Sequence, residues 1–217
     1  AARPVILRKL PISNVIESAP WQSLLRAAVS PFEAGAAPLQ VQGWHPSPDK
    51  AARPRRTAAV LVAVLDRPDP SVILTVRSRR MAKHAGQVAF PGGAADANDP
   101  SGVRTALREA EEEIGLNPGL VQPLGFLDRI DTVSDFRVLP VVGLVYGRVD
   151  LIPDKREVDL VFTVPLERVL DPDAYRETRI HRGGETRVVH SLRWHEQKVW
   201  GVTASILRNL AVRASAP

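Results

Sequence analysis

Three glutamates are concentrated within residues 108–116, shortly after a Gly-Gly pair. Glu109, Glu112 and Glu113 are separated by three and four residues, so a helix would place them together on one face. Like charges at this spacing repel each other by about 0.2–0.5 kcal/mol per pair on an exposed helix. A hard divalent cation, which prefers oxygen ligands, would turn that repulsion into a binding site. The spacing therefore predicts a site for Mg2+ or Mn2+, although a solvated acidic helix face has the same pattern.

The sequence around these glutamates has the pattern of a short amphipathic helix. We expect Asp99 to cap its N-terminus, Pro100 to occupy the first helical position and Gly115 to end it. Arg108 stands four residues before Glu112 and can brace that carboxylate from the side. Apolar residues recur every three or four positions and would face a core, namely Val103, Leu107, Ala110 and Ile114.

Residues 93–116 resemble the Nudix box of the Nudix hydrolases. The box runs Gly, five residues, Glu, seven residues, Arg-Glu, an apolar residue, any residue, Glu-Glu, any residue, Gly and an apolar residue. In the first half, Asp99 stands in place of the glutamate, and eight residues rather than seven separate it from Arg108. We therefore assign Asp99 to capping. The second half is matched at every fixed position, by Arg108, Glu109, Ala110, Glu112, Glu113, Gly115 and Leu116.

The preceding segment resembles the signature of the coenzyme A pyrophosphatase subgroup. That signature runs Leu-Leu-Thr, any residue, Arg-Ser or Arg-Ala, three residues, Arg, three residues, Gly, three residues and Phe-Pro-Gly-Gly. Residues 73–78 and 86–93 keep its spacing, but Ala82 occupies the second Arg position. The expected substrate-binding residues combine cations that pair with phosphates and glycines that let the backbone approach an anion. They are Arg77, Arg79, Arg80, Gly92 and Gly93; a solvated strand end is the alternative for the arginines.

The resemblance implies metal-dependent hydrolysis of the diphosphate bond of coenzyme A, acyl-CoA or both, giving 3′,5′-ADP and 4′-phosphopantetheine or its acylated form. By the same resemblance, the three glutamates are metal ligands, and Arg108 holds the carboxylates in position. One of these glutamates, or Glu157 on a loop outside the box, would take the proton from water. Two alternatives stay open: a Nudix pyrophosphatase for another nucleoside diphosphate derivative such as ADP-ribose, and a nucleotide-binding Nudix module without catalysis.

Apolar runs and turn signals outside the box predict further strands and helices. The resemblance implies an α/β Nudix fold, a mixed β-sheet sandwiched between α-helices, over residues 57–217. Residues 1–56 would form an N-terminal extension with a short helix at 21–29. In the last helix we expect Val202, Ile206 and Leu210 to face the core. Strands are expected at 58–65, 71–77, 124–131, 136–146 and 160–166, a hairpin at 175–180 and 186–190, and a strand running into a helix over 199–210.

Composition narrows the functional classes. The chain of 217 residues has no cysteine, which rules out disulfides and thiolate zinc sites. No apolar run approaches the roughly 18–20 residues that span a bilayer, and the N-terminus shows no signal-peptide core, so we expect a cytoplasmic protein and no membrane partner. The net charge is +5, but the basic residues are scattered and aromatic content is 5%, which disfavours nucleic acid. We expect a small-molecule partner and leave a homodimer open.

Overall fold

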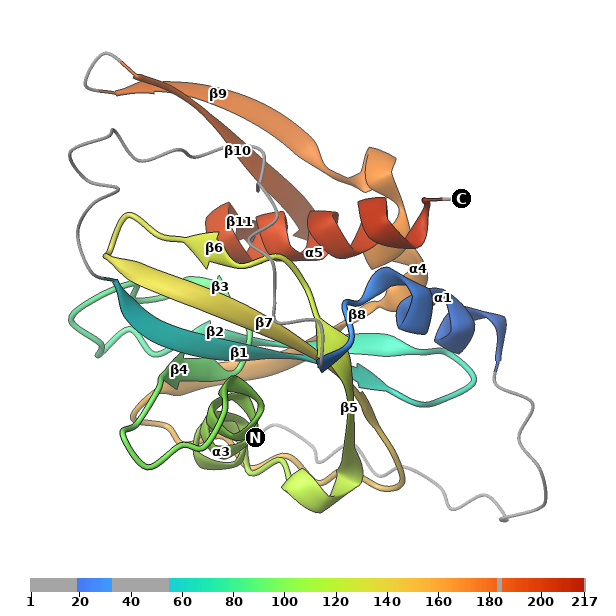
Figure 1. Cartoon of the computed structure of the whole chain (residues 1–217). Helices are drawn as coiled ribbons and strands as arrows, with labels where there is room; N and C mark the ends of the chain where they lie inside the picture. The colour runs from blue at the N-terminus through green and yellow to red at the C-terminus, as the bar shows by residue number, and fades with distance from the viewer. Residues whose placement is uncertain (1–18, 33–54, 183–184, 217) are drawn as a thin grey trace.

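The computed structural model describes residues 19–32, 55–182 and 185–216. The predicted extension therefore falls outside the described residues over 1–18 and 33–54. Within the described part, α3 covers one face of a large mixed sheet, and α1, α4, α5 and a small second sheet cover the other (Figure 1). This arrangement confirms the predicted α/β fold with a mixed sheet between helices.

The large sheet has eight strands in the described residues, and its central strand pairs in both directions. β1 runs parallel to β7 along its whole length and antiparallel to β2 and β4, which makes the sheet mixed. The strand order is β3-β2-β1-β7-β5. In addition, β8 pairs with β2 and β6 pairs with β7. The strands are β1 (Arg56–Leu65), β2 (Ser71–Arg77), β3 (Val88–Ala89), β4 (Gly92–Ala94), β5 (Val121–Phe126), β6 (Ile130–Asp131), β7 (Phe136–Val145) and β8 (Val158–Pro165).

The helices and the small sheet complete the fold. The helices are α1 (Pro20–Ala28), α3 (Gly102–Ile114), α4 (Leu166–Leu170) and α5 (Gly201–Ala214), with 3-10 turns η2 (Pro118–Leu120) and η3 (Pro172–Ala174). The small antiparallel sheet contains β9 (Arg176–Arg182), β10 (Glu185–Trp194) and β11 (Gln197–Trp200). Among the described residues, no helix has the length and apolarity needed to cross a membrane.

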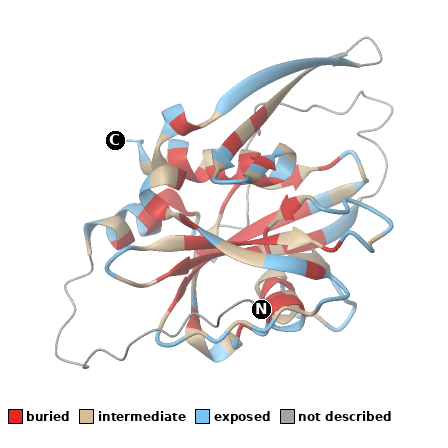
Figure 2. Cartoon of the chain, turned by 180° about the vertical axis from the view of Figure 1, so that it is seen from behind, coloured by how far each residue is buried: buried red, intermediate tan, exposed pale blue. Residues whose placement is uncertain are grey.

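Strand β1 is buried on both faces, which explains its continuous apolar sequence. Because side chains alternate along a strand, Leu61 and Ala63 pack in the cluster that contains the apolar stripe of α3. Val62 and Val64 belong to the opposite cluster, with residues of α1 and α5. The burial view shows the same two cores on either side of the sheet (Figure 2). One strand therefore fixes the position of α3 relative to the rest of the fold.

Two predicted features differ in the structure. The strand expected at 124–131 is interrupted, because the chain between β5 and β6 turns so that the buried Asp128 can bind residues of α5. Val202 was wrongly placed on the core face of α5, since its exposed fraction is 36%. The neighbouring Thr203 is buried instead, and its hydroxyl donates to the carbonyl of Val88 at 2.9 Å. Ile206 and Leu210 are buried as predicted.

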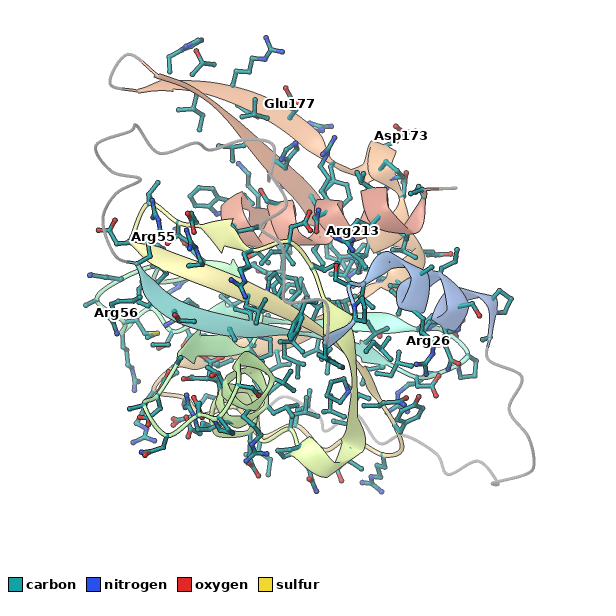
Figure 3. All side chains as sticks on the ribbon, viewed as in Figure 1. Arg26, Arg55, Arg56, Asp173, Glu177 and Arg213 are labelled. Carbon is teal, nitrogen blue, oxygen red and sulfur yellow. The ribbon has the colours of Figure 1, made fainter. Side chains whose placement is uncertain are left out.

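Arg213 joins α5 to α1 and to the turn after β5 (Figure 3). Its guanidinium pairs with Asp128 at 2.7 Å and donates to Ser30 Oγ at 2.9 Å and to the carbonyl of Ala28. Asp128 also accepts a bond of 2.7 Å from the Asn209 amide. The side chain of Asp128 is only 8% exposed, so its charge depends on these donors for compensation.

We expect Arg213→Ala to lower the free energy of unfolding by about 3 kcal/mol, because it leaves a buried carboxylate without its cation. Denaturant unfolding of both proteins measures the change. Arg148→Ala is the matched control: its pair with Asp150 is 62% and 65% exposed, so its loss should change stability by less than about 1 kcal/mol. Equal effects of the two substitutions would show that the Arg213 contacts do not anchor α5.

Candidate active site

The start of α3 differs from the prediction. The helix begins at Gly102, and the Ser101 hydroxyl accepts a bond of 3.3 Å from the Arg104 amide. The assignment of Asp99 as the cap, with Pro100 as the first helical residue, was therefore wrong. The Asp99 carboxylate instead accepts from the Arg108 guanidinium at 2.9 Å, while the serine beside the helix satisfies the free amide. The end was predicted correctly, since Gly115 closes the helix with φ +67°.

Arg108 connects α3 to three carboxylates and to strand β4. Its Nη1 lies 2.9 Å from Glu112 Oε2 and 3.0 Å from Glu109 Oε1, so the expected contact with Glu112 is present. Its Nη2 binds Asp99 and donates to the carbonyl of Ala94 at 3.1 Å. The Arg108 hydrogen bonds hold the pKa of Asp99 well below its usual range. One planar guanidinium thus compensates several acids and fixes them against the strand.

Glu109 lies directly over Gly93 of β4. A Cβ atom added at Gly93 would stand 2.5 Å from the Glu109 carboxyl carbon, closer than any real contact allows. Because Gly93 has no side chain, the Glu109 carboxylate can lie directly against β4 at this point. Burial raises the pKa of Glu109, Arg108 opposes that shift, and the charges of Glu112 and Glu157 add to it.

Glu113 is the most enclosed of the three glutamates, with an exposed fraction of 3%. The Gly92 amide donates to its Oε2 at 3.1 Å, and Arg77 Nη1 lies 3.5 Å from its Oε1. Burial raises the pKa of Glu113 to about 7, against the stabilising effect of the Gly92 amide and Arg77. The charges of Glu109 and Glu157 contribute to the same upward shift. Burial is therefore the main reason why Glu109 and Glu113 favour a proton or a bound cation over a bare negative charge.

The loop after β2 is anchored beside these glutamates. The Ser78 amide donates to the carbonyl of Glu157 at 2.7 Å, and the Arg79 amide donates to Asp159 Oδ2 at 3.0 Å. These bonds bring Arg77, the last residue of β2, and Glu157, which directly precedes β8, toward the same place. Asp159 was not predicted, because an isolated aspartate at an exposed strand position belongs to no recognisable sequence pattern.

Three of the predicted site residues, Glu112, Arg79 and Arg80, are exposed to solvent. The side chain of Glu112 is 59% exposed, whereas Glu109 is only 16% exposed, so the three glutamates have different environments. Arg79 and Arg80 are exposed and form no ion pair within the part of the chain that the structure describes. Their guanidinium groups are therefore accessible to a ligand.

The donor set suits a divalent cation, although it is not arranged as a closed cage. In residues 19–32, 55–182 and 185–216, no three His, Asp or Glu side chains are placed to hold an ion as they stand. Glu109 and Glu112 both contact Arg108 Nη1, whereas Glu113 is bound to the Gly92 amide. The fit is supported by the hard oxygen donors, by the mutual repulsion of Glu109, Glu113 and Glu157, and by the absence of a side chain at Gly93.

Residues 54–198, two thirds of the chain, match the NUDIX domain. The chain is 45% identical over 159 residues to the uncharacterised Nudix hydrolase NudL of Escherichia coli K12, covering 73% of this chain and 82% of that protein. It is 46% identical over 162 residues to NudL of Pectobacterium atrosepticum, covering 74% and 84%. Among solved structures, the Nudix hydrolase RenU of M. smegmatis matches with a TM-score of 0.45 and 21% identity over 53% of this chain and 73% of that one.

The burial of Glu113 predicts a pH-dependent stability in metal-free protein. Its folded pKa of about 7 lies above the reference value of 4.5, so the folded state binds the proton more tightly than the unfolded state. The resulting stabilisation is complete below pH 4.5 and is lost as pH rises through 7, by about 3 kcal/mol.

Denaturant unfolding with a chelator present, at several pH values between 4.5 and 8, measures this dependence. Glu113→Gln keeps an oxygen acceptor for the Gly92 amide but has no titrating group, so its stability should fall less over the same range. The difference between the two proteins isolates Glu113 from other titrating groups. Parallel curves for the two proteins would contradict the raised pKa.

Proposed function

We propose that this chain, which belongs to the Nudix hydrolase family, hydrolyses the diphosphate bond of coenzyme A, acyl-CoA or both. Water attacks one phosphorus, the bond from that phosphorus to the bridging oxygen breaks, and the products are 3′,5′-ADP and 4′-phosphopantetheine or its acylated form. The observation that carries the proposal is the segment 73–93, which resembles the coenzyme A pyrophosphatase signature except at Ala82 and whose Arg77 lies 3.5 Å from Glu113. We assign catalysis to residues 57–217 and treat 1–56 as an extension.

Glu109, Glu112 and Glu113 would hold the divalent cation, Mg2+ or Mn2+. A cation there supplies charge neutralisation for the attacking and leaving oxygens of the diphosphate. Arg108 contributes by holding two of these carboxylates at 2.9 and 3.0 Å, which limits their motion. Gly92 contributes its amide to Glu113 and so orients that side chain.

The proton of the attacking water needs a carboxylate acceptor. Glu157 is exposed at the start of β8, and its charge acts on both Glu109 and Glu113. Its exposure and its interaction with both glutamates support Glu157 as the base, with one of the three α3 glutamates as the alternative.

The substrate phosphates would bind on the side of the β2–β3 loop. Arg77 is held beside the acidic centre, and Arg79 and Arg80 extend from the anchored loop without an acidic partner among the described residues. Arginine can bind a phosphate through two parallel hydrogen bonds, which positions it as well as neutralising it. Gly93, with no side chain, leaves room for Glu109 below the ligand.

Glu112→Gln is the sharpest test of the catalytic assignment. We expect a folded protein whose turnover with Mg2+ falls at least about 100-fold, because a charged ligand oxygen is lost. Glu111→Gln is the matched control, since it removes the same charge from the neighbouring exposed position of α3 and should retain nearly normal activity. Near-normal turnover of Glu112→Gln would exclude Glu112 from the catalytic site.

A substrate panel separates the proposed specificity from its alternatives. Coenzyme A, an acyl-CoA and ADP-ribose are compared under the same conditions with Mg2+ and with Mn2+, and the phosphorylated products are identified. We expect the highest kcat/KM for coenzyme A or the acyl-CoA, with 3′,5′-ADP as product. Faster hydrolysis of ADP-ribose would favour the other nucleotide substrate. No hydrolysis of any of the three would favour a binding module without catalysis.

A further inference from the structure

A cavity lined by cations lies between α4, η3 and the small sheet. Its volume is about 300 Å3, which is near the lower end of pockets that hold small molecules. Four of its lining residues carry positive charge and two carry hydroxyl groups; they are Arg168, Arg176, Arg193, Lys198, Thr178 and Ser191.

The strand register explains why these side chains converge. Ser191 of β10 stands opposite Arg176 of β9, and Arg193 of β10 stands opposite Lys198 of β11. Directly paired residues lie on the same face of a sheet, and so do residues two apart on one strand. The four side chains therefore share one face. The alternate residues Leu192 and Val199, on the opposite face, are fully buried in the core that contains α5.

The positive charge of this cavity is largely uncompensated. Arg168 pairs with Asp171 at 3.2 Å. Arg176, Arg193 and Lys198 are exposed, and none of them forms an ion pair with any residue of the described chain. Like charges on neighbouring strands repel each other, and an anion between them would remove that repulsion. Sequence spacing alone does not bring these cations together, because the register of β9 and β11 with β10 is a property of the folded sheet.

The cavity is remote from the acidic site of α3. Its lining residues come from α4, η3 and β9–β11, whereas the glutamates belong to a helix on the opposite face of the large sheet (Figure 1). Figure 2 shows β9 largely exposed along its length. A ligand bound at this cavity would therefore not be in contact with α3.

We propose that this cavity binds a small anion that carries two or more linked phosphates. Three or four cations around a space of this volume match a short polyphosphate, and the hydroxyls of Thr178 and Ser191 can donate to its oxygens. Trp200 stands opposite Ser191 on the same face with an exposed fraction of 43%, so a base attached to the phosphates could stack on it. Two classes of ligand thus fit the cavity, a free polyphosphate and a nucleoside polyphosphate.

Isothermal titration calorimetry of the full chain, with a chelator present and at fixed ionic strength, tests this site. The probes are inorganic tripolyphosphate, ADP and inorganic phosphate. Arg176→Ala/Arg193→Ala removes two cavity cations. Arg26→Ala/Arg148→Ala removes two exposed arginines outside the cavity. It has the same net charge as the cavity double variant, so it controls for general electrostatic attraction. Lys198→Ala is a second cavity variant, and Arg77→Ala tests binding at the catalytic arginines. Thermal unfolding of each variant verifies that it is folded.

We expect tripolyphosphate to bind the wild type more tightly than inorganic phosphate does. The cavity double variant should bind tripolyphosphate at least about tenfold more weakly, and Lys198→Ala should weaken it in the same direction. Tighter binding of ADP than of tripolyphosphate would identify the nucleotide as the ligand, and the reverse order would identify the free polyphosphate. The proposal is overturned by undetectable binding, by equal losses in the two double variants, or by a loss confined to Arg77→Ala. Hydrolytic activity does not enter this test, so its outcome is independent of the proposed catalytic function.

Discussion

The acidic centre depends on one guanidinium, that of Arg108. It lies between Asp99, Glu109 and Glu112, and it also donates to the carbonyl of Ala94 on β4. Without this cation, carboxylates on adjacent turns of α3 would repel one another and turn toward water. The arginine therefore has two roles. It compensates the charge of the acids, and it attaches α3 to β4, the strand that contains Gly92 and Gly93.

The remaining geometry follows from the burial of β1. This strand packs against α3 through one row of side chains and against the α1 and α5 layer through the other. It also pairs with β4, so Gly93 stands under Glu109 and the Gly92 amide reaches Glu113. The site is thus built on packed helices and strands, which hold side chains more accurately than loops do. The loop that follows Arg77 is attached by the Ser78 amide to the carbonyl of Glu157 and by the Arg79 amide to the Asp159 carboxylate.

Local sequence patterns predicted α3, its C-terminal glycine and the central strands, because apolar spacing and turn residues determine those features directly. The same patterns do not distinguish the three glutamates from one another, because they place all three on one helix face. The rotation of α3 against β4 separates them, since Glu113 is buried against Gly92 while Glu112 remains exposed. The role of Asp99 also depends on a tertiary contact, with Arg108 nine residues later. The cation-lined cavity depends on strand register, which no short motif encodes.

Electron paramagnetic resonance titration of Mn2+ tests most directly whether the carboxylates of α3 hold a divalent cation. The wild type, Glu109→Gln and Glu111→Gln are compared at the same pH, and unfolding curves verify that each protein is folded. We expect Glu109→Gln to bind Mn2+ at least about tenfold more weakly than the wild type and Glu111→Gln to bind it normally. Equal affinity of the wild type and Glu109→Gln would contradict the assignment of Glu109 as a ligand, because the metal would then be held elsewhere.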